Sequence, residues 1–525
     1  MTSTHAHPQR EAAPTTIVLG ERPLTIEEVV RVARHRAPVT IAESSREKML
    51  RAREAVDRLA AADTPAYGVS TGFGALADRK IDVSARTRLQ ASLVRSHAAG
   101  TGAEVEEEAV RAMMLLRLQT LTTGRTGVSP AVADRYVTLL NEVLTPVVHE
   151  NGSLGCSGDL APLAHCALAV IGEGQVRDRD GVLRDSAEAL AGAGSSPVEL
   201  QAKEGLSLIN GTDGMLGMLA LSLHDLHEVA RAVDVSAAMS IEALLGTDRV
   251  FEAALHEVRP HPGQRASARN LATLLAESAI VASHRGADCT VVQDAYSLRC
   301  APQVAGAFRA TLAHAESVAG IELASAVDNP VVLDDGRVES NGNFHGAPVG
   351  YVLDFLAIAV ADLASMSERR TDRLLDPARS HGLPAFLGAD PGIDSGLMIA
   401  QYTQASLVSD LKRLAAPASV DSIPSSAMQE DHVSMGWAAA RKLRRAVDAV
   451  QRVIAIELMA AARGLELRAP LDPSPATGAA LRTIREHVEG VGPDRWLSPD
   501  IELMVRLVRS REVTAAAQSV AGPLS

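Results

Sequence analysis

Apolar and polar positions follow a helical period along most of the chain. Apolar residues that recur three and four positions apart form one face of a helix. The longest such run, from Met435 to Arg463, contains no proline and a single glycine, Gly436. The pattern predicts helices over residues 103–123, 129–147, 206–232, 263–283, 302–320, 346–370, 398–416 and 435–463.

Two short signals mark helix starts near the N-terminus. Thr25 stands three residues before Glu28, and Ser44 stands three residues before Glu47. In a capping box, the hydroxyl of the first residue accepts the backbone N–H of the second, and the carboxylate of the second accepts the backbone N–H of the first. The spacing predicts a capping box at both places.

Strand signals are sparse. They are confined to the segment TTIVLGE at residues 15–21 and to two hairpin turns, at Asp180-Gly181 and Asp335-Gly336. The expected fold class is therefore mainly α with few short strands. Helices as long as the one after Met435 need partners along their whole length, which favours a bundle or an oligomer core.

Composition narrows the possible partners. Only 2% of the 525 residues are aromatic, so Ala, Leu and Val must fill the core, as in closely packed helices. The net charge is −13 and no long basic run occurs, which argues against nucleic acid and anionic membranes as partners. The apolar stretch at 355–361 lies between two aspartates and is too short to span a bilayer.

The cysteines and the N-terminus point to a reducing compartment. The four cysteines form no CxxC pair, so a disulfide scaffold is not expected and a cytoplasmic location fits. The first residues have no apolar core and are interpreted as a flexible tail over 1–22.

Three motifs resemble functional signatures but fail on context. GFGALA (72–77) matches a dinucleotide fingerprint, yet no strand precedes it and a charged segment follows. GCSGD departs from the nucleophile elbow GxSxG because residue 159 is aspartate. His165 and Cys166 have no third ligand at metal spacing, so no metal site is predicted.

Polar islands interrupt the apolar helices. Taken singly, these segments have ordinary structural interpretations. Asn210-Gly211 can be a turn, Glu430-Asp431-His432 a helix cap, and Tyr67 or Tyr296 a half-buried tyrosine. A purely structural interpretation is less convincing for the islands as a set, because two of the five tyrosines lie in islands rich in glycine or charge, where a core tyrosine is not expected. The islands span residues 67–74, 95–100, 152–163, 206–214, 292–304, 339–346 and 425–436.

In this order, the islands resemble those of the aromatic amino acid ammonia-lyases and aminomutases. The resemblance runs from about residue 24 to 512. In that family an Ala-Ser-Gly tripeptide cyclises into 4-methylideneimidazol-5-one, an electrophile built from the protein's own backbone. The matching tripeptide is Cys156-Ser157-Gly158.

The ring chemistry explains these three residue types. The amide nitrogen of Gly158 must attack the carbonyl carbon of residue 156, which needs a tight turn without a side chain at 158. Loss of the Ser157 hydroxyl as a second water creates the methylidene group. Residue 156 gives only backbone to the ring, so cysteine can replace alanine, and its thiol is expected to be a spectator.

The resemblance also implies roles for residues on the other islands. Tyr67 would be the base that removes the β-proton, and Arg299 would clamp the substrate carboxylate with its two-pronged guanidinium. The resemblance implies that three more residues steady the prosthetic ring and the amine: Asn210, Gln293 and Tyr296. Phe344 would pack over the ring of the substrate or of the electrophile.

Two positions bear on the substrate. The pair Ser96-His97 matches the histidine-specific members, and His97 can hydrogen-bond an imidazole. Glu430 stands where the phenylalanine and tyrosine enzymes carry asparagine, and a carboxylate suits an imidazole N–H better than an apolar ring. The resemblance therefore implies conversion of L-histidine to trans-urocanate and ammonia, without an external cofactor or metal.

The family further implies a homotetramer with active sites drawn from three subunits. We expect an N-terminal lyase domain over 23–232 that carries the tripeptide, and an elongated bundle of long helices over 233–525. Alternatives remain open: a tyrosine or phenylalanine ammonia-lyase, an aminomutase, a serine hydrolase that uses Ser157, or an inactive helical scaffold.

Overall fold

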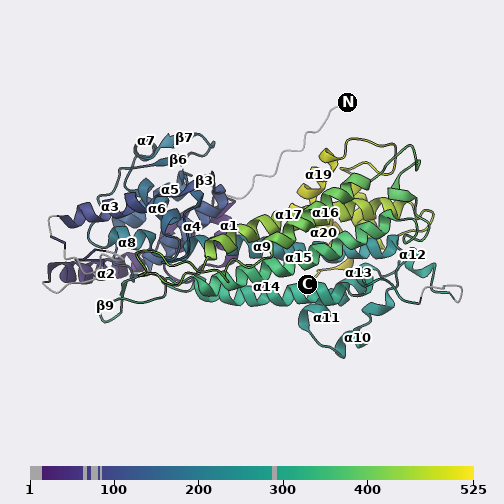
Figure 1. Ribbon diagram of the computed structural model, residues 1–525, viewed down its shortest axis with the longest axis horizontal. Helices are drawn as coiled ribbons and strands as arrows, with labels where there is room; N and C mark the ends of the chain where they lie inside the picture. The colour runs from purple at the N-terminus through teal and green to yellow at the C-terminus, as the bar shows by residue number, and fades with distance from the viewer. Residues whose placement is uncertain (1–14, 63–67, 73–80, 83–84, 287–291) are drawn as a thin grey trace. The chain divides into compact units, whose positions relative to one another are not determined.

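The computed structural model describes residues 15–62, 68–72, 81–82, 85–286 and 292–525. Over these residues the protein is mainly α-helical with few short strands, as the sequence predicts (Figure 1). By compactness the chain divides into two units. The first contains the described residues up to Leu221 together with Gly320–Ala347 and Asp421–Trp437, and the second contains Ser222–Ala319, Pro348–Val420 and Ala438–Ser525.

The first unit combines short helices with small sheets. Its strands form a parallel pair β1–β2, the antiparallel pairs β3–β5 and β8–β9, and a three-stranded sheet in the order β4-β6-β7. The strands are β1 Ile17–Leu19, β2 Val39–Ile41, β3 Thr101–Glu104, β4 Thr145–Pro146, β5 His149–Asn151, β6 Gln175–Arg177, β7 Leu183–Asp185, β8 Val331–Val332 and β9 Val338–Glu339. The helices are α1 Ile26–Ala33, α2 Glu43–Ala61, α3 Arg86–His97, α4 Glu107–Thr122, α5 Pro130–Asn141, α6 Leu160–Val170, α7 Ser186–Gly192 and α8 Glu204–Ile209.

Long helices make up most of the second unit. Four of them begin or end in the first unit: α9 Asp213–Ala243, α14 Ala301–Leu323, α15 Ala347–Leu375 and α17 Gly436–Glu466. The others are α10 Ala253–Glu257, α11 Pro262–Leu274, α12 Ala279–Ala282, α13 Tyr296–Arg299, α16 Met398–Leu414, α18 Pro475–Arg485, α19 Ser498–Arg509 and α20 Glu512–Ala521, with 3₁₀ turns η3 Arg249–Phe251 and η4 Ala385–Leu387.

The division by compactness differs from contiguous domains over 23–232 and 233–525. Two segments beyond residue 232, Gly320–Ala347 and Asp421–Trp437, belong to the first unit. Both connect long helices, so the chain leaves the second unit and returns to it twice. The domain boundaries drawn from the sequence stay a prediction.

Helix α4 forms the centre of the first unit. Every residue from Ala109 to Thr122 is buried, and α1, α2, α5 and α6 all pack against this helix. It buries two arginines, Arg111 and Arg117, whose guanidinium groups bond to backbone carbonyls of other segments. The apolar residues of α4 are mostly Leu, Met, Ala and Val, which agrees with a core that is poor in aromatic residues.

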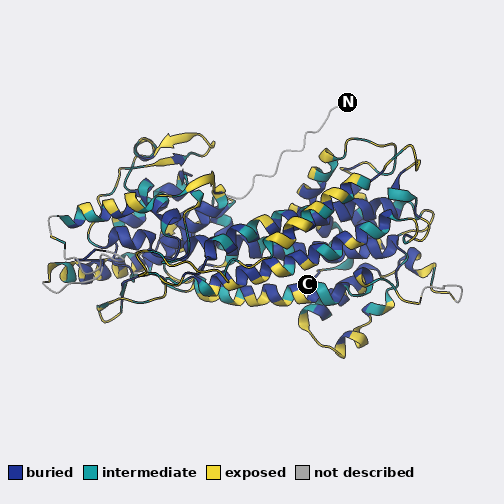
Figure 2. Ribbon diagram, viewed as in Figure 1, coloured by how far each residue is buried: buried dark blue, intermediate teal, exposed yellow. Residues whose placement is uncertain are grey.

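Helices α9, α15 and α17 pack together in the second unit around one buried carboxylate. Figure 2 shows α9 and α17 as mostly buried. Glu457 on α17 accepts hydrogen bonds from Ser236 and Ser240 on α9 and from Ser367 on α15. Arg370 on α15 donates to both oxygens of the same carboxylate, at 2.5 and 2.8 Å. The carboxylate is thereby fully paired, as a buried charge requires.

Helix α15 is long and apolar enough to cross a membrane by length and composition, and no other helix in the described part of the chain is. Its most apolar 18-residue window has a mean hydropathy of 1.7, and 61% of that window is buried inside the structure. The same helix contains the buried Asp354, which accepts hydrogen bonds from Lys442 and from the backbone of Ser419. These contacts are typical of a core helix.

Candidate active site

The tripeptide Cys156-Ser157-Gly158 lies in a tight turn between β5 and α6. Gly155 and Gly158 both adopt left-handed φ angles, +70° and +77°, and Gly158 forms isolated bridges with Gly155 and Cys156. A Cβ atom at Gly158 would lie 2.0 Å from the carbonyl oxygen of Gly211. Only glycine fits there, and the turn brings the backbone of residues 156 and 158 together. These residues therefore fit the cyclisation that the resemblance implies.

Asp159 holds this turn and was not among the predicted site residues. Its side chain is fully buried and accepts hydrogen bonds from the backbone N–H groups of Gly214 and Met215, both at 2.9 Å. Its own N–H donates to Gly211 at 2.7 Å. Burial raises the pKa of the Asp159 carboxyl to about 7. The available signal was an aspartate directly before an apolar helix, which by itself indicates only a helix cap.

Asn210 lies at the end of α8, beside the tripeptide. Its backbone carbonyl accepts a hydrogen bond from Arg117 at 2.8 Å, and the next residue, Gly211, forms a bridge with Gly158. The side-chain oxygen of Asn210 is buried and has no hydrogen-bond partner among the described residues. A buried, unpaired acceptor is costly unless a ligand or prosthetic group satisfies it, which suits the predicted role of Asn210.

His97, at the end of α3, is held in one tautomer. Its Nδ1 lies 2.9 Å from the carbonyl oxygen of Leu93, and since a carbonyl can only accept, Nδ1 is the donor. The neighbouring Ser96 hydroxyl donates to the same carbonyl at 3.0 Å. Burial lowers the pKa of His97, so the ring is neutral at pH 7 and its Nε2 keeps a free lone pair. That nitrogen can accept a hydrogen bond from the N–H of an imidazole.

Glu430 lies close enough to His97 and Cys156 for its charge to affect both. Its backbone pairs with that of Ser425 in both directions, and the Ser425 hydroxyl donates to its carboxylate at 3.0 Å. The carboxylate acts electrostatically on both His97 and Cys156. Burial, together with nearby Glu430, raises the pKa of the Cys156 thiol to about 12, so the thiol stays protonated.

Phe344 lies on the loop that follows β9, next to a histidine pair that joins two islands. The rings of His345 and His432 stack with their centroids 5.4 Å apart, and Nδ1 of His432 lies 3.3 Å from Nε2 of His345. This contact connects the Phe344 loop to the Glu430 segment. The first unit thus holds the tripeptide and the predicted residues Ser96, His97, Asn210, Phe344 and Glu430.

A second group of predicted residues lies in the second unit. The guanidinium of Arg299 lies over the ring of Tyr296, 4.6 Å from its centroid. Gln293 and Arg299 line one cavity of about 460 Å³. Tyr296 is 69% exposed, so it is not an ordinary core tyrosine. The predicted base, Tyr67, lies outside the described residues.

Comparison with known proteins agrees with this geometry. The family model for aromatic amino acid lyases matches residues 24–486. The chain belongs to this family. A histidine ammonia-lyase of Streptomyces coelicolor is 61% identical over 97% of this chain and 99% of its own length. One from Sorangium cellulosum is 49% identical over 97% of this chain and the whole of its own length.

Solved structures of the aromatic amino acid lyase family share the fold over nearly the whole chain. A tyrosine aminomutase from Streptomyces globisporus has a TM-score of 0.92 at 38% identity and covers 97% of this chain and 100% of its own. Histidine ammonia-lyase from Trypanosoma cruzi has a TM-score of 0.89 at 36% identity and covers 96% of each chain. Lyases and aminomutases therefore share this fold, so the fold alone does not distinguish the two reactions.

Proposed function

We propose that this protein is a histidine ammonia-lyase, a carbon–nitrogen lyase that converts L-histidine to trans-urocanate and ammonia. The observation that carries the proposal is the turn at Cys156-Ser157-Gly158, where only glycine fits at 158 and the backbone is already folded back on itself. The near-full-length relatives from Streptomyces and Sorangium, named as histidine ammonia-lyases, support the choice of substrate.

We propose that the tripeptide cyclises to 4-methylideneimidazol-5-one without an external cofactor. When present, this group supplies an electrophile that makes the amine a better leaving group. Asn210, whose buried side-chain oxygen lacks a partner among the described residues, is the residue best placed to hold the ring or the amine. Asp159 and Gly211 fix the backbone from which the ring is made.

The chain's own side chains account for binding and proton transfer. Arg299 offers two parallel N–H donors to the substrate carboxylate, and Tyr67 is the proposed base for the β-proton. The neutral His97 and the Glu430 carboxylate are both acceptors, so together they suit a protonated imidazole, whose two N–H groups can each donate to one of them. A phenyl ring can satisfy neither acceptor, and a phenol, with its single O–H, can satisfy only one of them, which favours histidine over phenylalanine and tyrosine.

We further propose a cytoplasmic homotetramer in which neighbouring subunits complete each active site. Support for assembly comes from large apolar side chains that are exposed on two long helices: Tyr351, Phe355 and Ile358 on α15, and Ile399 and Tyr402 on α16. Side chains of this size on long helices are typical of surfaces that pair with another helix.

A substrate comparison tests the proposal. The purified protein is incubated with L-histidine, L-tyrosine or L-phenylalanine, and the unsaturated acid is followed by its ultraviolet absorbance while ammonia is measured separately. We expect one ammonia per urocanate from histidine and little product from the other two. Formation of a β-amino acid without ammonia would instead identify an aminomutase, and labelling of Ser157 by a phosphonate would identify a hydrolase.

A further inference from the structure

Arg117 on α4 joins two segments that are distant in sequence. Its side chain is fully buried. One guanidinium nitrogen donates to the carbonyl oxygen of Asn210 at 2.8 Å, and the other donates to that of Val327 at 2.7 Å. Its Nε lies 3.5 Å from the carboxylate of Asp213. A planar guanidinium presents its N–H donors in a rigid fork, so it holds the two carbonyls at a fixed separation, which the single nitrogen of a lysine does not reproduce.

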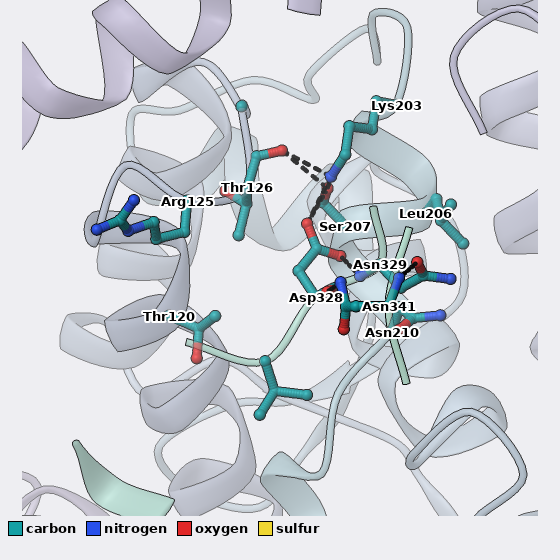
Figure 3. A network of polar contacts seen from close by, with 12 residues as sticks. Thr120, Arg125, Thr126, Lys203, Leu206, Ser207, Asn210, Asp328, Asn329 and Asn341 are labelled. Carbon is teal, nitrogen blue, oxygen red and sulfur yellow. Dashed lines mark hydrogen bonds and ion pairs between the residues drawn. The ribbon is translucent and has the colours of Figure 1, made fainter. Parts of the chain in front are cut away.

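A second buried cation makes the same connection a few residues away. Lys203, directly before α8, donates from Nζ to Asp328 at 2.5 Å and to the hydroxyl of Ser207 at 2.6 Å. Both Lys203 and Asp328 are fully buried. Figure 3 shows these groups converging on the Nζ atom, with Asn210 at the far end of the same helix. The α8–Asn210 segment is thus tied to residues 327–328 at both of its ends.

The α8–Asn210 segment leads directly into Gly211, and the tripeptide turn packs against the backbone of Gly211. A Cβ atom on Gly211 would lie 2.6 Å from a guanidinium nitrogen of Arg117, so the two are in direct contact. On its other side, the carbonyl oxygen of Gly211 accepts the N–H of Asp159 and lies 2.0 Å from where a Cβ of Gly158 would stand. Arg117, Gly211 and Gly158 therefore form three layers with no space between them.

We propose that Arg117, supported by the Lys203–Asp328 ion pair, is a positioning residue for formation of the prosthetic ring. In this step the nitrogen of Gly158 bonds to the carbonyl carbon of Cys156, and that carbon forms a double bond to the nitrogen of Ser157. The carbonyl oxygen leaves as water with the two amide hydrogens of Gly158 and Ser157. The Ser157 hydroxyl and its α-hydrogen leave as a second water, and no oxidant or reductant is needed. An amide nitrogen is a weak nucleophile, so the reaction depends on packing that keeps the nitrogen of Gly158 close to the carbonyl carbon of Cys156. Gly211, backed by Arg117, provides that packing. This inference rests on the proposed function.

The test compares two arginines of the same helix. Arg111, like Arg117, is fully buried and bonds to the carbonyls of two separate segments, Val32 and Leu140, neither of which belongs to the tripeptide turn or to the α8–Asn210 segment. The full-length chain carrying Arg117→Lys or Arg111→Lys is made by cell-free translation, and the loss of two waters is followed by intact mass against time. Thermal unfolding and circular dichroism are recorded for both variants.

We expect Arg117→Lys to slow the loss of two waters by about tenfold or more, while Arg111→Lys cyclises at the wild-type rate despite a comparable loss of thermal stability. A folded Arg117→Lys chain that cyclises as fast as Arg111→Lys would overturn the inference. If Arg117→Lys does not fold, the same measurement is made on the double variant Lys203→Met/Asp328→Leu, which replaces the buried ion pair by apolar side chains. Slowed cyclisation in that variant supports the inference, and cyclisation at the wild-type rate contradicts it. A wild-type chain that never loses two waters would instead contradict the proposed function.

Discussion

His97 shows how one backbone contact gives a side chain its chemical role. Because Nδ1 donates to Leu93, the Nε2 lone pair is free, and burial keeps the ring neutral. The sequence predicted that His97 and Glu430 belong to one site, since both lie in polar islands that matched a known family in order. It could not predict the tautomer, because that depends on a carbonyl one helical turn away and on burial by distant segments.

The substitution His97→Leu tests this role. It removes an acceptor that a phenyl ring leaves unpaired, and an unpaired buried polar group costs about 1–3 kcal/mol. We expect kcat/KM for L-histidine to fall roughly tenfold to hundredfold, while turnover of L-phenylalanine becomes detectable. Glu430→Asn should shift the preference in the same direction. An unchanged ratio of the two kcat/KM values in His97→Leu would remove the main structural support for histidine.

At the scale of elements, patterns that depend on neighbouring residues were predicted well. The capping box at Thr25 and Glu28 is confirmed, and so are β1 and the hairpins at Asp180-Gly181 and Asp335-Gly336. The capping box predicted at Ser44 and Glu47 is wrong. Helix α2 already begins at Glu43 with Ala42 as its N-cap, and Ser45 is buried against Gly20, a tertiary contact that no local spacing reveals.

Tertiary contacts shorten one predicted helix and interrupt another, while the helix predicted over 263–283 is divided into α11 and α12. The helix predicted over 129–147 stops at Asn141, since Thr145 and Pro146 pair with β6 instead. The helix predicted over 206–232 is interrupted at Asn210, where the next residue packs on the tripeptide. Strand pairing and the functional site thus override helical periodicity at particular residues.

The buried carboxylate between α9, α15 and α17 gives a prediction about stability. Arg370→Met leaves Glu457 buried without its cation, so we expect a loss of about 3–5 kcal/mol in the free energy of unfolding, measured by urea titration. Replacing both partners, as Arg370→Met/Glu457→Leu, should cost much less because no unpaired charge remains. If the double variant is no more stable than the single one, the ion pair is not the source of the loss.

Helix α6 gives a prediction about pH. Nε2 of His165 accepts the N–H of Gly100 at 3.1 Å, so its ring is neutral, and burial, together with nearby His149, lowers its pKa below the ordinary value of 6.5. As the pH falls below about 6.5, the unfolded chain therefore binds the proton first and the free energy of unfolding decreases. We expect Tm to fall between about pH 7 and 5 less steeply in His165→Gln, whose side-chain oxygen accepts without titrating. Equal slopes in the two proteins would contradict this account.

At the scale of the whole molecule, the exposed apolar side chains of α15 predict assembly. Phe355→Asp places a charge between the exposed side chains of Tyr351 and Ile358. Removing the phenyl ring from a subunit interface costs about 1.5–3 kcal/mol, and burying the new charge there costs more. We expect sedimentation to show smaller species and histidine turnover to fall with them. Leu50→Asp, at a similarly exposed leucine on α2, is the control and should leave the assembly intact. A Phe355→Asp protein of wild-type mass in solution would contradict the proposed interface.

In the function proposed above, the chain makes its own electrophile at Cys156-Ser157-Gly158 and uses it to deaminate histidine. The most direct measurement is urocanate release from L-histidine by wild type, Ser157→Ala and Cys156→Ala, with folding checked by circular dichroism. Ser157→Ala removes the hydroxyl whose loss makes the methylidene, so we expect no turnover from a folded protein. Cys156→Ala changes only a protonated side chain beside the ring, and we expect its turnover to stay near that of wild type. Sustained urocanate release by Ser157→Ala would contradict the account.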